Sequence, residues 1–259
     1  MNTILEVKNE NHICEITINR PQALNALNDQ VLDSLALEIE KVNQDSDIRV
    51  CIITGAGEKA FVAGADLSLF NQFSPEELQA YVNKGQAVMR SIESARVPVI
   101  AAVNGFALGG GLELALSCDL IVASKKAKLG TPEVKLGVIP GFGGTQRLVH
   151  RCGIGHARWL VYSAEMIGAE KAHTWGLVDE VVEPQEVKSR AQALAQIIAS
   201  RGPLAVQGSK KLIRESQDEQ LVQGLKMEVK MFCSVFDSED RKEGVSAFFE
   251  KREAQWTGS

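Results

Sequence analysis

Val103-Asn-Gly-Phe-Ala-Leu-Gly-Gly-Gly-Leu-Glu113 is the stretch of sequence that decides the fold of this 259-residue chain. Residues 97–103, which lead into it, are apolar and rich in β-branched side chains, so they predict a buried strand. Residues 111–117 predict a short buried helix. The glycines between them allow a backbone N–H group to approach a ligand oxygen, because no side chain stands in the way. This order of elements predicts an α/β fold with a binding turn.

Strand and helix patterns alternate over most of the chain. Residues 13–18, 50–53, 120–124 and 127–130 are short apolar segments typical of strands. A helix is expected after Asn28, with apolar residues at the 3–4 spacing of one buried face. These residues are Val31, Leu32, Leu35, Ile39 and Val42. The alternation predicts an α/β layout with parallel strands.

Ser74-Pro-Glu-Glu77 marks the start of another helix, which is expected to continue to about Ser94. It combines an N-cap serine, a proline at the first helical position and a glutamate three residues after the cap. Beyond Val182 only helical patterns follow, and their apolar residues exceed what a lone helix pair needs. We therefore predict a core over residues 1–197 and a helical region over 198–259, packed on the core and on another subunit.

A second segment of small residues, Phe61-Val-Ala-Gly-Ala-Asp66, resembles the first in character. Ala65 can present an N–H group from a tight turn, and Gly110 can present another just before a helix. Two donors aimed at one carbonyl oxygen stabilise negative charge on it, and removing one typically costs about 3–4 kcal/mol. Turn formation or close packing would also explain isolated glycines, but the paired segments favour a carbonyl site.

Two glutamates accompany these donors. Glu113 lies between Leu112 and Leu114, where burying a carboxylate is costly unless the group is hydrogen-bonded or functional. Burial would raise its pKa toward the range useful for proton transfer. Glu133 follows Pro132 in an expected loop and can point into a cleft, although alone it would also suit a solvated surface. Together, two carboxyl groups can share one water and move protons beside a bound carbonyl.

Composition and motifs exclude several other classes. The net charge of −5 is unlike that of a general nucleic-acid binder, so no nucleic-acid partner is expected. The glycine runs complete neither G-x-G-x-x-G nor G-x-x-x-x-G-K-[ST], which argues against a nicotinamide or nucleoside triphosphate site. Five scattered cysteines and four histidines show no metal-ligand spacing, so no metal site is predicted.

The N-terminal sequence and one apolar run bear on location. Met1-Asn-Thr-Ile-Leu-Glu6 lacks the pattern of a secretory signal, so a cytoplasmic location is expected. Residues 97–116 have the length of a membrane span, but Pro98, Asn104 and Glu113 interrupt it. A buried strand followed by a buried helix fits better, and no membrane association is predicted.

The two glycine segments and the glutamate pair resemble those of the enoyl-CoA hydratases of the crotonase superfamily. The resemblance extends over nearly the whole length of the chain. The resemblance implies a crotonase-like spiral core of ββα units with an all-helical C-terminal trimerisation region, assembled as homotrimers that often pair into homohexamers. Ala65 and Gly110 match the two oxyanion-hole positions, and Glu113 and Glu133 match the two catalytic glutamates. It implies reversible hydration of a trans-2-enoyl-CoA to a 3-hydroxyacyl-CoA, a chemistry of fatty-acid β-oxidation, without a metal or redox cofactor.

The same resemblance assigns further contacts. Gly141, in Ile139-Pro-Gly-Phe-Gly-Gly-Thr-Gln-Arg-Leu148, matches a position whose backbone helps to seat the attacking water. Ala23, Leu24 and Ala63 match positions that contact coenzyme A, the carrier part of the acyl-CoA substrate. Lys251 is a candidate for the coenzyme A phosphates, because Gln22 and Ser68 stand where relatives often carry lysine.

The residues after Ala65 are expected to complete the substrate site. Asp66 more plausibly fixes this loop than takes part in the reaction. Leu67 and Phe70 are expected to wall the acyl pocket, although core packing would explain them equally well. Two other functions stay open: a Δ3,Δ2-enoyl-CoA isomerase or other crotonase-type enzyme, since one glutamate can move a proton between C2 and C4, and a non-enzymatic RNA-binding role.

Overall fold

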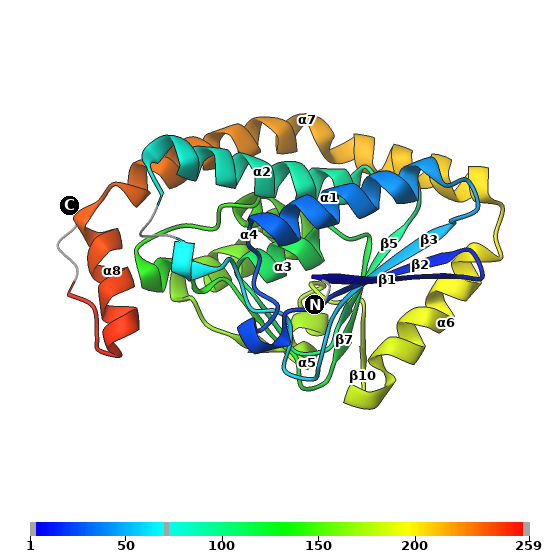
Figure 1. Ribbon diagram of the computed structural model, residues 1–259, viewed down its shortest axis with the longest axis horizontal. Coiled ribbons are helices and arrows are strands. Elements are labelled where there is room, and N and C mark those ends of the chain that lie inside the picture. Colours follow the sequence, from blue (N-terminus) through cyan, green and yellow to red (C-terminus); the bar gives the residue numbers. More distant parts are fainter. Residues whose placement is uncertain (1–3, 70–72, 256–259) are drawn as a thin grey trace.

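The computed structural model describes residues 4–69 and 73–255, and its main sheet has six strands (Figure 1). In spatial order these are β1 (Leu5–Glu10), β2 (Ile13–Ile18), β3 (Val50–Gly55), β5 (Val99–Val103), β7 (Leu120–Ser124) and β10 (Glu180–Val182). All neighbours pair in parallel except β1 and β2, which form an antiparallel hairpin. The predicted parallel layout is therefore confirmed for most of this sheet.

A second, four-stranded sheet consists of short strands. Its order is β4 (Ala60–Val62), β6 (Phe106–Leu108), β8 (Lys128–Gly130) and β9 (Ile167–Gly168). The first three are parallel, and β9 pairs antiparallel with β8. Three pairs of successive strands join the two sheets: β3 and β4, β5 and β6, and β7 and β8. In each pair the first strand belongs to the main sheet and the second to the smaller sheet, and a helix follows the pair. This is the expected spiral of ββα units.

Eight α-helices occur in the described residues. They are α1 (Asp29–Gln44), α2 (Pro75–Glu93), α3 (Gly110–Leu116), α4 (Gly144–Ser163), α5 (Ala169–Thr174), α6 (Val187–Ala199), α7 (Pro203–Phe236) and α8 (Glu239–Glu250). Short 3-10 helices are η1 (Pro21–Ala23), η2 (Leu67–Leu69), η3 (Pro132–Leu136) and η4 (Pro184–Glu186). Helix α7 runs alongside α2 across one side of the molecule, and α8 then turns along its end (Figure 1).

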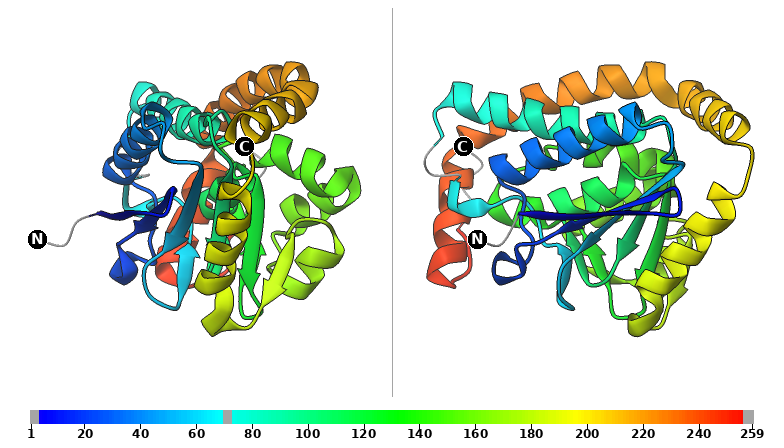
Figure 2. Two further views of the ribbon diagram at one scale, coloured as in Figure 1. Left: turned by 90° about the vertical axis from the view of Figure 1, so that its right-hand side faces the viewer. Right: turned by 45° about the vertical axis from the view of Figure 1, so that its right-hand side comes forward.

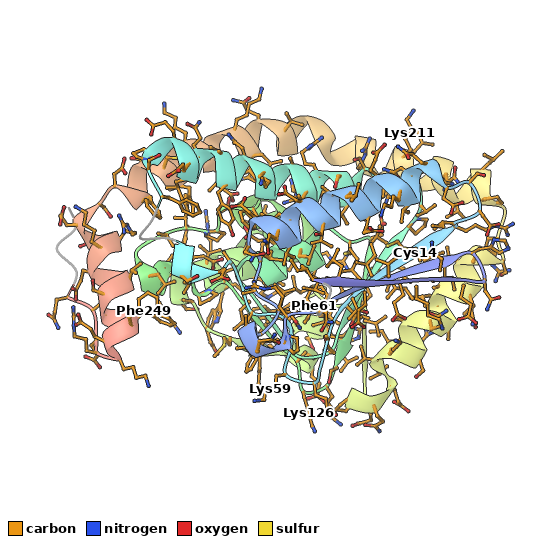
Figure 3. All side chains as sticks on the ribbon, in the orientation of Figure 1. Cys14, Lys59, Phe61, Lys126, Lys211 and Phe249 are labelled. Carbon is orange, nitrogen blue, oxygen red and sulfur yellow. The ribbon has the colours of Figure 1, made fainter. Side chains whose placement is uncertain are left out.

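Helices cover both faces of the main sheet because successive strand residues point to opposite sides. In β3, Val50 and Ile52 face α6, whereas Cys51 and Ile53 join the large core on the other face. Helix α6 packs along β3, β5 and β7, as Figure 2 shows. In Figure 3, Cys14 and Phe61 lie inside the molecule. The near-continuous apolar strands follow from this burial on both faces.

The helix predictions are confirmed in detail. Helix α1 is capped by Asn28, whose side chain accepts from the Val31 N–H group, and it buries the five apolar residues predicted for its inner face. Helix α2 begins with a complete capping box at Ser74 and Glu77 and ends before Ser94. The division at residues 197 and 198 stays a prediction; α6 ends at Ala199 and α7 begins at Pro203. In the described part of the chain, no helix is both long and apolar enough to cross a bilayer.

Candidate active site

The candidate site lies at one edge of the second sheet. Strand β4 leads into Ala63-Gly-Ala65, β6 into Gly109-Gly110, and β8 into Thr131-Pro-Glu133. These strands are parallel neighbours, and Leu108 pairs with Gly130 at their ends. Carboxyl ends of parallel strands meet at the same sheet edge, which is the usual ligand position in open α/β sheets. Segments separated by up to 70 residues are thereby brought together.

A cavity of about 90 Å³ opens at this edge. Its polar lining includes the two glutamates and the small-residue turns predicted from the sequence. The predicted residues that line it are Ala63, Ala65, Leu67, Gly110, Glu113, Glu133 and Gly141. The structure therefore brings these predicted residues together around one cavity, and the chemical role of each stays a prediction.

Glu113 is held by a turn that follows far along the chain. Its Oε1 atom accepts hydrogen bonds from the N–H groups of Phe142 at 2.8 Å and Gly144 at 2.7 Å. Within the described residues its Oε2 atom accepts none, and the side chain lines the cavity. Burial raises the pKa of Glu113 well above its ordinary value, and the negative charges of Glu133 and Glu228 raise it further. The two N–H groups oppose this rise because they favour the ionised form.

Glu133 lies in η3 rather than in the irregular loop expected from the sequence. Its Oε2 atom is buried and has no hydrogen-bond partner among the described residues. A Cβ atom built on Gly109 would lie 2.6 Å from Glu133 Oε1, so this glycine leaves room for the carboxyl group. Burial raises the pKa of Glu133 to about 8, with a smaller rise from the charge of Glu228. A raised pKa brings this carboxyl group into the range useful for proton transfer near neutral pH.

The backbone N–H groups of Ala65 and Gly110 are available to a ligand. Neither has a hydrogen-bond acceptor within the part of the chain that the structure describes. On either side of Ala65, the backbone is tied to Leu27: the Leu27 N–H group donates to Gly64 O at 2.9 Å, and the Asp66 N–H group donates to Leu27 O at 2.8 Å. This pairing fixes the turn at Ala65 while leaving its own N–H group free.

Apolar side chains from several elements wall the cavity. Val82 comes from α2, Leu136 from η3 and Phe232 from α7, and Leu67 packs against the same cluster. Leu67 therefore lines the cavity as expected, whereas Phe70 lies outside the described residues. The C-terminal helix α7 thus contributes directly to the site of the same chain.

The segment around η1 lies along the Ala65 turn. Ala23 ends η1, and the Leu24 carbonyl accepts a hydrogen bond from the Ala63 N–H group at 3.1 Å. Leu24 has a φ of 50° and is 37% exposed, so its side chain is open to a ligand outside the cavity. Ala23 and Leu24 are not among the cavity-lining residues. Their place beside Ala63 suits contact with a part of the substrate that extends out of the cavity.

Asp66 fixes the loop, as preferred from the sequence. Its carboxylate receives the Arg20 guanidinium at 3.1 Å and the Ser68 hydroxyl at 2.7 Å, and these hydrogen bonds lower its pKa against the opposing effect of burial. Lys251 is exposed and lies just after α8, and it does not line the cavity. Neither residue reaches the two glutamates within this chain.

Sequence reasoning missed Tyr81 and Glu228. Tyr81 lines the cavity from α2 and donates its hydroxyl to Leu27 O at 2.9 Å. Burial raises the pKa of this phenol, so it stays a donor. Glu228 is a buried acid on α7, only 3% exposed, whose backbone partners lie about 85 residues earlier in the chain. An acid within the apolar pattern of that helix was the one available signal.

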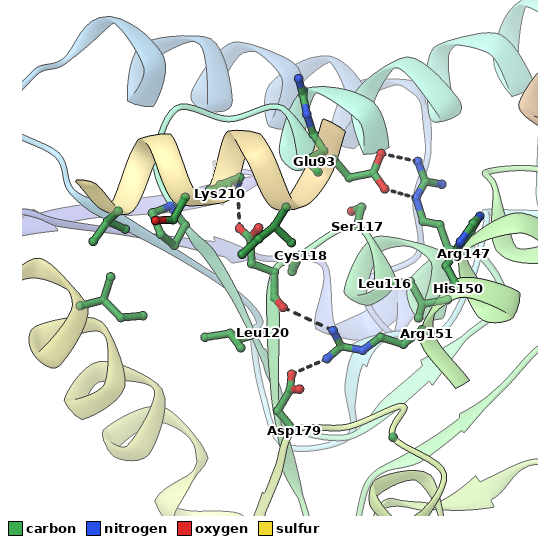
Figure 4. A pocket seen from close by; sticks show the side chains of 18 of the residues that line it. Glu93, Leu116, Ser117, Cys118, Leu120, Arg147, His150, Arg151, Asp179 and Lys210 are labelled. Carbon is green, nitrogen blue, oxygen red and sulfur yellow. Dashed lines mark hydrogen bonds and ion pairs between the residues drawn. The ribbon is translucent and has the colours of Figure 1, made fainter. Parts of the chain in front are cut away.

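A larger cavity of about 890 Å³ lies elsewhere, between α4, α6, β7 and α7 (Figure 4). Its three acids are all paired with cations. The pairs are Glu93 with Arg147 at 2.6 Å, Asp119 with Lys210 at 2.7 Å, and Asp179 with Arg151. None of the predicted site residues lines it. Paired carboxylates are poorly suited to proton transfer, so the smaller cavity is the better candidate despite its size.

Comparison with known proteins gives a consistent result. The family model described as enoyl-CoA hydratase/isomerase matches residues 8–259. A short-chain-enoyl-CoA hydratase of Clostridium acetobutylicum is 45% identical over 254 residues, which cover 98% of this chain and 97% of that protein. A crotonyl-CoA hydratase of Syntrophomonas wolfei is 45% identical over 255 residues, with coverage of 98% and 97%.

The likeness extends to solved structures. The crystal structure of an enoyl-CoA hydratase/isomerase from Pseudoalteromonas atlantica matches with a TM-score of 0.90 at 33% sequence identity. The match covers 98% of this chain and 100% of that one, so it includes both sheets and the C-terminal helices.

Proposed function

Because the chain belongs to the enoyl-CoA hydratase/isomerase family, we propose that it adds water reversibly to a trans-2-enoyl-CoA, giving a 3-hydroxyacyl-CoA. The observation that carries this proposal is the pairing of two buried carboxyl groups with two unpaired N–H groups around one cavity. The small apolar cavity and the names of the two relatives support a short acyl chain.

In this proposal, the N–H groups of Ala65 and Gly110 hold the thioester oxygen. Negative charge develops on that oxygen as water adds at C3, because the double bond is conjugated with the carbonyl. Donors that are already fixed need not reorganise when the charge appears. Ala23, Leu24 and Ala63 would contact the coenzyme A part of the substrate, and Leu67 would contact the acyl part.

The two glutamates divide the protons of one water addition. Glu113, whose Oε1 atom two N–H groups hold, takes a proton from the water as the oxygen bonds to C3. Glu133, whose pKa burial raises, delivers a proton to C2. The two carboxyl groups titrate as a coupled pair, so the pH profile reports the pair. Gly141 would help to seat the water from the same turn.

These groups supply the whole reaction, so the proposal includes no metal or redox cofactor. The acyl-CoA thioester is the only partner that the chemistry requires. Assembly as a homotrimer or homohexamer and a cytoplasmic location remain predictions.

Hydration of crotonyl-CoA by wild type, Glu113→Gln and Glu133→Gln tests the proposal. The loss of the conjugated enoyl-thioester absorbance reports the rate. We expect rapid turnover by wild type and a fall of several orders of magnitude in both variants, because neither amide can exchange the proton. Chromatography of the products would separate hydration from double-bond isomerisation. If folded wild type hydrates neither short, long nor branched enoyl-CoAs, the proposed function is wrong.

A further inference from the structure

The turn over residues 141–145 is held from two sides by two different carboxyl groups. The N–H groups of Phe142 and Gly144 donate to Glu113, on the cavity side. The N–H groups of Gly143 and Thr145 donate to Glu228, on α7, at 2.6 and 3.2 Å. Successive N–H groups therefore alternate between the two acids, and a shift of the turn away from one acid disturbs its bonds to the other.

Glu228 is fully engaged in this contact. Its Oε1 atom accepts from Gly143 N–H and from Gln86 Nε2 at 3.2 Å, and its Oε2 atom accepts from the N–H and hydroxyl groups of Thr145. Each oxygen thus has two donors. A carboxylate is the one side chain of this size that accepts at both ends and donates at neither. The surrounding donors therefore favour the ionised form, and they oppose the effect of burial, which raises the pKa of Glu228 above its ordinary value.

We propose that Glu228 is a positioning residue for the proposed hydration: it fixes the 141–145 turn from its outer side, so that the inner N–H groups of the turn hold Glu113. This role rests on the proposed function for its effect on rate, but its contacts with the turn stand independently. It also assigns a task to α7 beyond packing, because the C-terminal helix orients an acid of the site through the backbone of a distant turn.

The charge of Glu228 gives this role a signature that packing alone would lack. The charged groups around it are Arg147, which is paired with Glu93, and the two site acids Glu113 and Glu133. The negative charge of Glu228 raises the pKa of both site acids. Removing it lowers both pKa values, so the acidic and alkaline limbs of the rate profile move to lower pH.

The test compares Glu228→Gln, Glu228→Asp and Thr145→Val with wild type in crotonyl-CoA hydration. Glu228→Gln keeps the side-chain size but can accept from only one of the Gly143 and Thr145 N–H groups, so circular dichroism checks that the variant folds. We expect its kcat to fall about ten- to a hundredfold with KM changed less than about threefold, because Glu113 is misplaced while substrate contacts remain. Both limbs of its pH profile should move to lower pH.

The other two variants separate the effect of the charge of Glu228 from the effect of its side-chain length and hydrogen bonds. Glu228→Asp keeps the charge but shortens the side chain, so its kcat should fall without displacement of the pH limbs. Thr145→Val removes one hydroxyl donor and should lower kcat less than about threefold. Glu40→Gln, on the exposed face of α1, is the matched control for loss of one acid and should behave as wild type.

Folded Glu228→Gln with the kcat and pH profile of wild type would overturn the positioning role. If wild type hydrates no enoyl-CoA, the proposed function fails instead. Hydrogen exchange then still tests whether Glu228 holds the turn. The amides over residues 142–145 should exchange faster in Glu228→Gln than in wild type. Unchanged exchange there would show that Glu228 does not hold the turn.

Discussion

At the scale of single residues, the site depends on buried acids kept in different surroundings. Glu113 has two backbone donors on one oxygen, whereas the buried Oε2 atom of Glu133 has none among the described residues. Burial raises the pKa of both, and donors favour ionisation of Glu113. A pair with different surroundings is what acid and base roles at one pH require.

The raised pKa of Glu133 makes stability depend on pH. Its carboxyl group has a pKa of about 8 in the folded chain and an ordinary value of 4.5 when unfolded, so the folded state binds more protons between these values. Stability from this group is therefore fully present below about pH 4.5 and is lost as the pH rises through 8. Glu133→Gln has no carboxyl group at this position, so it does not lose stability in this way as the pH rises.

We therefore expect Glu133→Gln to unfold at a higher temperature than wild type at pH 8.5, by roughly 5 °C for a difference on the order of 2 kcal/mol. The difference in unfolding temperature between the two proteins should become smaller toward pH 5, where the Glu133 carboxyl group of folded wild type is neutral. Thermal denaturation followed by circular dichroism measures this, with Glu40→Gln as the exposed control. A constant gap at all pH values would contradict the linkage.

At the scale of elements, helix α2 supports the turn that holds Glu113. Gly85 of α2 faces the Phe142 ring, and a Cβ atom at this position would lie 2.2 Å from that ring. Tyr81, one turn earlier, contacts the same ring edge-on with centroids 5.5 Å apart. The helix can approach the turn this closely because glycine has no side chain.

Gly85→Ala should therefore displace Phe142, whose N–H group donates to Glu113. We expect about 1–3 kcal/mol of destabilisation from overpacking, although alanine is the better helix former. We also expect at least about a tenfold fall in kcat from misplacement of Glu113. Urea denaturation and hydration kinetics measure the two effects.

Gly208→Ala is the matched control, because nothing lies within 4 Å of a Cβ atom built at this exposed position of α7. It should raise stability by up to about 1 kcal/mol and leave the rate unchanged. If Gly85→Ala has the same stability and hydration rate as wild type, α2 does not constrain the turn.

At the scale of the whole molecule, the C-terminal helices serve the site and also leave apolar surface uncovered. Helix α7 places Phe232 at the cavity and Glu228 behind the turn. On α8, Phe248 and Phe249 are each 54% exposed, with ring centroids 5.5 Å apart. An exposed aromatic pair is typical of a surface that another chain covers.

We expect the chain to assemble with a mass that is a multiple of three of the 28.1 kDa subunit. Phe248→Glu combined with Phe249→Glu should lower this mass, because it places charge on the apolar surface of α8. Multi-angle light scattering measures both proteins, and Ser246→Glu controls for added charge on the same helix. A monomeric wild type, or an unchanged mass in the double variant, would exclude this surface from assembly.

Part of the structure follows from local sequence. The faces of α1, the cap of α2 and the buried strands β2, β3, β5 and β7 were predictable, because periodicity and capping act within a few residues. The exposed edge strand β1 was missed, and so were β4, β6, β9 and β10, which have only two or three residues. Such segments carry too little pattern to be recognised, and tertiary pairing decides them.

The sequence by itself determined which residues are candidates for the chemistry: two turns of small residues, and an acid placed in an apolar helix. It also determined the ββα order, through the family resemblance that these motifs carry. Only the tertiary structure decided how the acids are held. Glu113 bonds to a turn 29 residues away, and that turn bonds to Glu228 a further 85 residues on. No local pattern encodes such contacts, because they exist only once the sheets and α7 have packed.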